Sequence, residues 1–272
     1  EARAFLQIIE DSANYQFGYN HSTGYSMIGY MCAFCRYYYP EEFIAAYLNC
    51  ANNTDDILMG TELAKIKNIE IKNIKFRKSG AEYTVDKANH ALYKGIASIK
   101  FCNAQIADDL LELATNQYNN FTEVLADVNT KTSVNSRQLT ILIGLNYFEE
   151  FGKNQYLMQV SEIYDKFALC KIISKKKMES LGLTEYLMKK YAGKETASQY
   201  RDLDNTGLIA ELSNRLENKA MSVIDQVKFE KEYLQYVVYV NPKVNQCFYV
   251  VTDYKTFKEV RKPYCVLHNI KT

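Results

Sequence analysis

A short polar turn near the start of the chain has residue types that can bind an anion. Asn20-His21-Ser22-Thr23-Gly24 supplies side chains able to cap the start of a helix, and Tyr25 follows directly. Free backbone N–H groups at a helix start can receive a negatively charged group, and His21 would stand at that end of the helix. A role for His21 in helix capping or in a core hydrogen bond is the alternative.

The residues after this turn predict two consecutive helices. Apolar side chains recur at three- and four-residue intervals, at Met27, Met31, Phe34 and Tyr38. This spacing predicts a buried helix that runs to about Tyr39. Pro40 then occupies a first helical position, and the carboxylates of Glu41 and Glu42 favour the positive end of a helix dipole. A second helix is therefore expected from Glu41 to about Cys50.

This segment resembles the fingers domain of bacterial replicative DNA polymerase III alpha subunits, the C-family polymerases. The family pattern runs approximately Phe-Asn-Lys/Arg-Ser-His, three residues, Tyr, and then a helix that ends in Tyr-Pro-x-Glu-Phe-x-Ala-Ala. The matching positions are Phe17, His21, Tyr25, Tyr30, Tyr39-Pro40, Glu42-Phe43 and Ala45-Ala46. The resemblance implies that Asn20, His21, Ser22 and Tyr25 bind the incoming nucleotide. The basic residue of the family pattern is Tyr19 here, which puts one triphosphate contact in doubt.

Composition describes an ordinary globular protein with more than one core. The chain has 272 residues, of which 47% are hydrophobic and 24% charged. It has no run of about 18 apolar residues and no signal peptide, so we expect no membrane partner. Seven scattered cysteines favour a reducing compartment, and a cytoplasmic location is expected. Residue 1 is Glu rather than Met, which suggests a piece of a longer protein.

Positive charge is concentrated in two segments. Residues 65–78 carry six basic and one acidic side chain, and residues 171–190 carry six basic and two acidic ones. Such segments can follow a phosphate backbone, since each neutralised phosphate releases counterions. A solvated face of a strand or helix is the alternative for both. In the first segment the candidate DNA-binding residues are Lys72, Lys75, Arg77 and Lys78.

The segment from Gly95 to Asn103 resembles the first part of the family's helix-hairpin-helix. In that motif a Gly-x-Gly turn brings backbone N–H groups up to a DNA phosphate, and a side chain would block the approach. This chain has Phe101-Cys102-Asn103 instead. Asn103 can take a left-handed conformation and cap the following helix. We expect the hairpin to form and its grip on phosphate to be weak.

Further residues near this turn are assigned from the resemblance. Lys100 and Asn103 are predicted to contact DNA, and Arg137 lies in a segment similar to the family's Val-Asn-Lys-Arg helix start. Asp108 and Asp109 follow one turn later, where their charge would repel phosphate.

The fold class expected is mainly α with small β elements. We predict a multi-helical fingers-like domain with a small basic strand element (1–94), a helix-hairpin-helix-like region (95–155), a helical clamp-proximal section (156–245) and the start of an OB-like fold (246–272). The helical section should include a long helix from residue 154 to about 177 and a polar loop at 193–206. Two alternating runs near the C-terminus predict the opening hairpin of the OB-like fold.

No catalytic or metal-binding residues are predicted in this chain. Nucleotidyl transfer needs metal ions on clustered carboxylates, and the sequence has no Asp-x-Asp pair on a strand. Asp55-Asp56 is better explained by capping, and Cys32-x-x-Cys35 has no second pair for zinc and is expected to be buried. The resemblance places the catalytic aspartates and their Mg²⁺ in a palm domain that would precede Glu1. This fragment alone is therefore predicted to be inactive.

Two functions from different classes remain open from the sequence. The first is a fragment of a DNA-directed DNA polymerase, a nucleotidyltransferase, that positions template DNA and the incoming dNTP. The second is a non-catalytic, diverged replicase fragment that acts as a DNA- or protein-interaction module. DNA and dNTP are the expected partners within the intact polymerase, with the sliding clamp as a further candidate.

Overall fold

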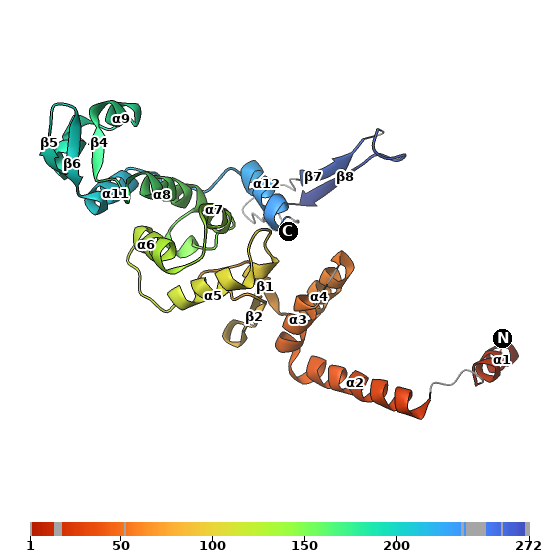
Figure 1. Cartoon of the computed structure of the whole chain (residues 1–272). Helices are drawn as coiled ribbons and strands as arrows, with labels where there is room; N and C mark the ends of the chain where they lie inside the picture. The colour runs from red at the N-terminus through yellow and green to blue at the C-terminus, as the bar shows by residue number, and fades with distance from the viewer. Residues whose placement is uncertain are drawn as a thin grey trace. The chain divides into compact units, whose positions relative to one another are not determined.

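The computed structural model describes residues 2–13, 18–51, 53–234, 237, 249–256 and 258–269 (Figure 1). The chain divides into two compact units, and each is treated by itself below. The first unit comprises residues 1–71 and 85–92, and the second comprises residues 72–84 and 93–272. The described part is mainly helical with small sheets, which confirms the predicted fold class. The four domain ranges proposed from the sequence stay a prediction.

The first unit has four α-helices among its described residues. They are α1 (Ala2–Ala13), α2 (Tyr19–Tyr38), α3 (Pro40–Asn49) and α4 (Thr54–Ile66). Pro40 begins α3 with two carboxylates in its first turn, as predicted. The side chain of Asn53 accepts a hydrogen bond from the Asp56 N–H and caps α4. Ile44 and Leu48 of α3 are buried, and α4 approaches them closely at Gly60.

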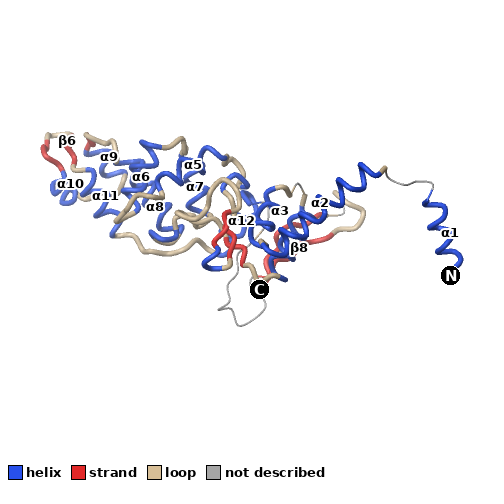
Figure 2. The backbone as a smooth tube through the Cα atoms, turned by 90° about the horizontal axis from the view of Figure 1, so that it is seen from below, coloured by secondary structure: helices blue, strands red, loops and turns tan. Residues whose placement is uncertain are grey.

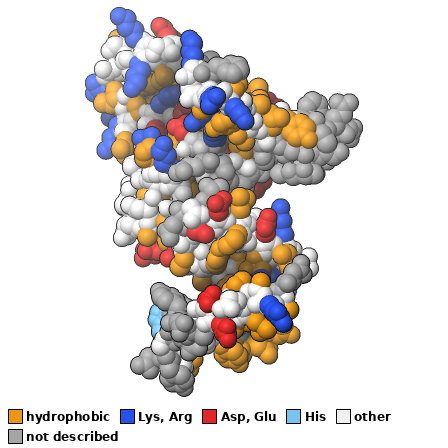
Figure 3. Space-filling model, turned by 90° about the vertical axis from the view of Figure 1, so that its right-hand side faces the viewer, with side chains coloured by type: hydrophobic (Ala, Val, Ile, Leu, Met, Phe, Trp, Pro, Cys, Tyr) orange, Lys and Arg blue, Asp and Glu red, His pale blue; other side chains and the backbone are white. Residues whose placement is uncertain are grey.

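The prediction that α2 is a buried helix is wrong for the described structure. Its large apolar side chains are open to solvent, and Figure 3 shows many apolar side chains, in orange, on the molecular surface. The most exposed are Tyr25, Met27, Ile28, Tyr30, Met31, Tyr37 and Tyr38. Cys32 and Cys35 are exposed as well. Apolar spacing defines one face of a helix, but burial also needs another element to cover that face.

Three short strands form the basic strand element. They are β1 (Glu70–Lys72), β2 (Thr84–Asp86) and β3 (Ala91–Tyr93), in the sheet order β1-β3-β2. A single 3₁₀ turn, η1 (Lys87–Asn89), joins β2 to β3. His90 closes this turn in a left-handed conformation with φ of 50°.

The second unit has its main core among consecutive helices that begin after the strands. These are η2 (Ile96–Ser98), α5 (Ala104–Leu113), α6 (Phe121–Lys131), α7 (Ser136–Gly144), η3 (Glu149–Phe151) and α8 (Asn154–Phe167), and Figure 2 shows α5 to α8 grouped together. Asn103, Asn120 and Asn135 cap α5, α6 and α7 with their side-chain oxygens. Apolar residues of these helices form one continuous buried cluster around Leu110, Leu125 and Leu142.

A second, smaller core follows along the chain. It is built from the end of α8, β4 (Ile172–Ser174), α9 (Lys175–Ser180), α10 (Glu185–Tyr191), β5 (Ala192–Glu195), β6 (Gln199–Leu203) and α11 (Asn205–Asn214). The strands pair antiparallel in the order β4-β6-β5. This sheet differs from the prediction of one helix from residue 154 to about 177 and a loop at 193–206, since α8 ends at Phe167 and both segments contribute strands.

The C-terminal elements are α12 (Val223–Leu234) and the antiparallel hairpin β7 (Tyr249–Lys255) with β8 (Tyr264–Asn269). The two predicted strands are confirmed over the described residues. Their assignment to the start of an OB-like fold stays a prediction.

Helix α12 is held against the main core by a buried polar network. The Asn154 side-chain amide donates to Gln226 Oε1 at 2.6 Å and to the Gly144 carbonyl at 3.2 Å. The Gln226 amide donates in turn to Glu230 Oε1 at 2.9 Å. Asn154, Gln226 and Glu230 are each less than 5% exposed. Buried polar groups need such partners, and a satisfied network fixes one docking arrangement for α12.

Lys94 lies in the same buried region, and its burial should make the unfolding free energy depend on pH. Its side chain is 8% exposed, and burial lowers the pKa of its ammonium group to about 8, against the opposing attraction of Glu230. Between about pH 8 and 10.5 the unfolded chain therefore binds more protons at this residue than the folded chain. The stabilisation from Lys94 should rise with pH through this window and be lost as pH falls through 8.

The Lys94→Met variant isolates this contribution from the other titrating groups. We expect the difference in unfolding free energy, wild type minus variant, to increase from pH 8 to 10.5 in urea denaturation. A difference that stays flat across this range would contradict the assignment.

Candidate nucleic-acid interface

The hairpin between η2 and α5 forms despite its missing glycines. The Cys102 N–H donates to the Ile99 carbonyl at 3.0 Å, and Asn103 Oδ1 accepts from the Ile106 N–H at 3.1 Å. Asn103 caps α5 in an extended conformation, so the left-handed conformation expected for it is wrong. Phe101 takes that conformation instead, with φ of 72°. A bulky side chain thus occupies a backbone position that favours glycine.

Two cations predicted separately from the sequence meet at Phe101. The Arg137 guanidinium lies 3.7 Å from the centre of the Phe101 ring, and Lys100 Nζ lies 5.3 Å from it. All three side chains are exposed. Gln138, next to Arg137 at the start of α7, donates through Nε2 to the Phe101 carbonyl at 3.0 Å. The turn, η2 and the first turn of α7 therefore present a joint positive surface.

Negative charge lies one turn into α5, as expected. Asp109 Oδ2 accepts from the Ser133 N–H at 2.7 Å and from the Ser133 hydroxyl at 2.6 Å. These hydrogen bonds, together with one from Gln105, hold the pKa of the Asp109 carboxyl below its ordinary value. Asp109 therefore stays ionised at neutral pH while it fixes the loop before α7.

A second positive feature is the tight turn at residues 75–78, here called the basic turn. The Lys78 N–H donates to the Lys75 carbonyl at 3.1 Å, and the Phe76 N–H donates to the Tyr147 carbonyl at 2.8 Å. The Phe76 ring is 1% exposed and packs among other aromatic rings. Because Phe76 is anchored in the core, Lys75 and Lys78 are exposed on either side of it.

Arg77 in the same turn has a structural role that sequence reasoning missed. Its guanidinium donates to the carbonyls of Ala114 and Asn116, beyond the end of α5, and forms an ion pair with Glu150 at 2.9 Å. Unpaired carbonyls at the end of a helix favour such a cation. Nothing in the local sequence signals these partners, because they lie more than 35 residues away.

The predicted DNA-binding residues thus form two groups and not one cluster. The Arg77 guanidinium lies at the C-terminal end of α5, and Lys100 and Asn103 lie at its N-terminal end. A helix of ten residues is about 15 Å long. Lys72 is half-buried in β1, where Nζ lies 5.7 Å from the centre of the Tyr93 ring.

The candidate anion-binding residues lie on the first turns of α2. The helix begins at Tyr19 with Gly18 as its N-cap and without a side-chain capping bond, so the polar run lies inside the helix and the predicted capping role is wrong. His21 and Tyr25 are exposed, and their ring centres are 4.4 Å apart. Asn20 is helical, and its side chain lies outside the described part.

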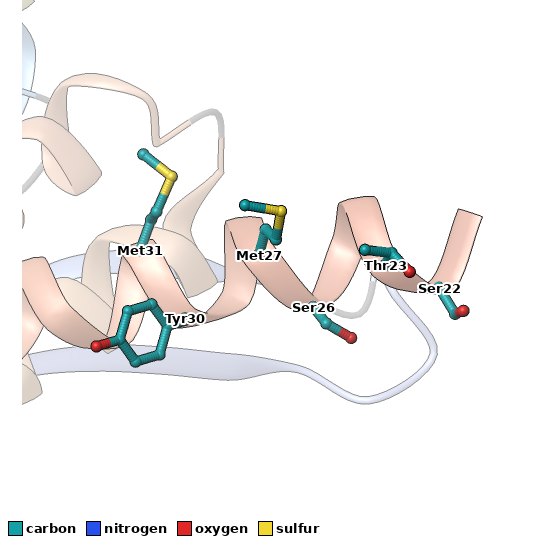
Figure 4. Close-up of a pocket in the computed structure, with 6 residues that line it drawn as sticks. All are labelled: Ser22, Thr23, Ser26, Met27, Tyr30 and Met31. Atoms are coloured by element: carbon teal, nitrogen blue, oxygen red, sulfur yellow. The ribbon is translucent and has the colours of Figure 1, made fainter. Parts of the chain in front are cut away.

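The surface depression beside these residues is formed by α2 alone. Ser22, Thr23, Ser26, Met27, Tyr30 and Met31 line it, and Figure 4 shows them along one helix. A depression with a single wall does not enclose a ligand. Within the described part, the candidate nucleotide residues therefore form an open surface.

Among the described residues, no three His, Cys, Asp or Glu side chains come together as a metal-ion site. No described helix combines the length and apolar character needed to cross a lipid bilayer.

The segment around the hairpin matches a protein-family model. Residues 68–158 match the model described as a helix-hairpin-helix motif, a range that includes the basic turn, the Phe101 hairpin and Arg137. This part of the chain is therefore similar to helix-hairpin-helix segments.

Several curated proteins are similar to this chain over half of its length or more. The DNA polymerase III subunit alpha of Campylobacter jejuni is 24% identical over 269 residues, which cover 95% of this chain and 21% of that protein. The subunits of Aquifex aeolicus (30% identical) and Ureaplasma parvum (27%) match 54% and 60% of this chain, and 13% and 17% of their own lengths. The resemblance stated from the sequence is confirmed: this chain is homologous to a segment of DNA polymerase III alpha subunits. It spans about a fifth or less of the length of these relatives.

Proposed function

We propose that this chain is the part of a replicative DNA polymerase that holds DNA beside the polymerising site. The single observation that carries the proposal is the similarity to DNA polymerase III alpha subunits along 95% of the chain, which contains a helix-hairpin-helix motif. The same similarity favours this function over a detached interaction module.

The DNA contact is assigned to the two cationic groups on either side of α5. The first group is Lys100 and Arg137 at the hairpin, and the second is Lys75 and Lys78 in the basic turn. All four side chains are exposed and carry positive charge. Asn103 contributes as the cap that shapes the hairpin. Contacts of this kind neutralise phosphates without reading bases, which suits an enzyme that copies every sequence.

A nucleotide contact at α2 is the second part of the proposal. Asn20, His21, Ser22 and Tyr25 lie on the first two turns of a helix of 20 residues, where the positive end of the helix dipole favours a triphosphate. The Mg²⁺ ions that support nucleotidyl transfer are expected in a palm domain of the intact polymerase, as is the transfer itself. A sliding clamp is a further proposed partner.

Salt-dependent DNA binding tests the first part. We expect the chain to bind a fluorescein-labelled duplex, and the Lys100→Ala/Arg137→Ala variant to bind more weakly with a smaller salt slope. Each phosphate contact that is lost should reduce the slope of log K against log salt by about 0.9. Fluorescence anisotropy between about 50 and 200 mM salt measures both quantities.

A matched variant removes equal charge elsewhere. Lys176 and Lys177 are exposed on α9 in the smaller core, so Lys176→Ala/Lys177→Ala should leave the salt slope unchanged. Equal losses in both variants would indicate general charge attraction and contradict a defined interface. Absence of wild-type binding at low salt would refute the DNA-holding role.

A further inference from the structure

We propose that Phe101 is a positioning residue, whose ring holds Lys100 and Arg137 together as a pair of phosphate-binding cations. The hairpin would then grip the DNA backbone through side-chain charge, where a glycine turn uses backbone N–H groups. This inference rests on the proposed function and specifies how the hairpin meets its ligand.

The geometry at the ring is the first support. The face of an aromatic ring attracts cations, and both Lys100 and Arg137 lie within 6 Å of its centre. The ring is 44% exposed, so the cations it holds remain accessible to a phosphate.

The backbone of the turn is the second support, because the N–H groups of Lys100 and Cys102, on either side of Phe101, already have partners. The Lys100 N–H donates to the Tyr233 carbonyl of α12 at 3.0 Å, and the Cys102 N–H donates to Ile99. The Ile106 N–H is taken by the Asn103 side chain. Three amides around the hairpin are thus directed to the protein itself.

The conformation of Phe101 is the third support. A φ of 72° is sterically disfavoured for any residue with a side chain, and glycine would adopt it freely. The strained conformation is held by the bond from Gln138 to the Phe101 carbonyl and by an edge-to-face contact with the Tyr233 ring, whose centre lies 6.4 Å from that of Phe101. A strained residue that is also exposed gains little from burial, which favours a functional role.

Replacing Phe101 distinguishes phosphate binding by positioned cations from phosphate binding by backbone N–H groups, because the two predict opposite changes in DNA affinity. If the ring positions the cations, Phe101→Gly should weaken binding of a labelled duplex by about 5-fold and lower the salt slope. If backbone N–H groups were the grip, the same change would open the turn and strengthen binding. Phe101→Trp keeps an aromatic face and should retain wild-type affinity, whereas Phe101→Leu should behave like the glycine variant.

A coupling measurement separates positioning from a general structural role. In the Lys100→Ala/Arg137→Ala background, Phe101→Gly should have no further effect on affinity, because the positioned groups are absent. Thermal unfolding of each variant reports whether the fold is intact, and glycine suits this backbone position. Affinity that is unchanged or higher in Phe101→Gly overturns the inference while the proposed function stands. No wild-type DNA binding overturns both.

Discussion

Gly95→Ala is expected to destabilise the second unit by about 3 kcal/mol. A Cβ at this position would lie 2.3 Å from the Ala81 carbonyl oxygen and 2.6 Å from the Glu82 Cα. These atoms belong to the backbone and are fixed, since the Ile96 and Ala97 N–H groups donate to the carbonyls of Gly80 and Ala81. The close approach must open before the methyl group fits. Urea denaturation followed by circular dichroism measures the loss.

Gly80 provides the matched control within the same pair of segments. A Cβ there would meet only Thr84 Oγ1, at an ordinary distance of 3.5 Å. Gly80→Ala should therefore change the unfolding free energy by less than about 1 kcal/mol. Equal losses at both positions would show that the loss of glycine flexibility, rather than the clash at Gly95, decides the outcome.

Phe76→Ala is expected to cost about 3 to 5 kcal/mol of stability, the range for large buried aromatic residues. The ring is 1% exposed, and its centre lies 5.4 to 6.4 Å from those of Tyr118, Tyr147, Phe148 and Phe151. The alanine variant leaves a cavity among these rings and frees the basic turn that Phe76 anchors. DNA affinity should fall as well, because Lys75 and Lys78 lose their fixed positions.

Phe76→Leu separates the two consequences. Leucine keeps apolar volume at the anchor, so the stability loss should be smaller and most of the DNA affinity should remain. Thermal unfolding and anisotropy titration on the same samples compare the two effects. Full stability in Phe76→Ala would contradict its place at the centre of the aromatic cluster.

Helix starts were the most predictable part of this fold. Pro40 with its two following carboxylates, and the asparagines that cap α4, α5 and α7, act on groups three residues away or less. These interactions can be predicted from the sequence because both partners lie within a few residues of each other. The β4-β6-β5 sheet was missed because Ile173 pairs with Tyr200, and no local pattern encodes a partner that distant.

The sequence identified several residues of the candidate interface but not the contacts between them. Lys100 and Arg137 were each identified, but their meeting over Phe101 depends on how α7 packs beside the hairpin. Arg77 has the same residue type as a phosphate-binding side chain, and only tertiary structure reveals that its donors go to α5 and Glu150. For α2 the apolar spacing correctly predicted a helix. It could not predict that the apolar side chains are exposed, because burial depends on which other elements cover the helix.

Helix α8 belongs to both cores of the second unit. Leu157 and Val160 are buried among the hairpin helices, Phe167 is buried against the β4-β6-β5 sheet, and Tyr164 contacts both clusters. A single unbroken rod thus joins the two globules without a hinge residue between them. Proteolysis or an insertion in its middle would deprive each globule of part of its interior, so neither globule keeps its full core when the chain is cut within α8.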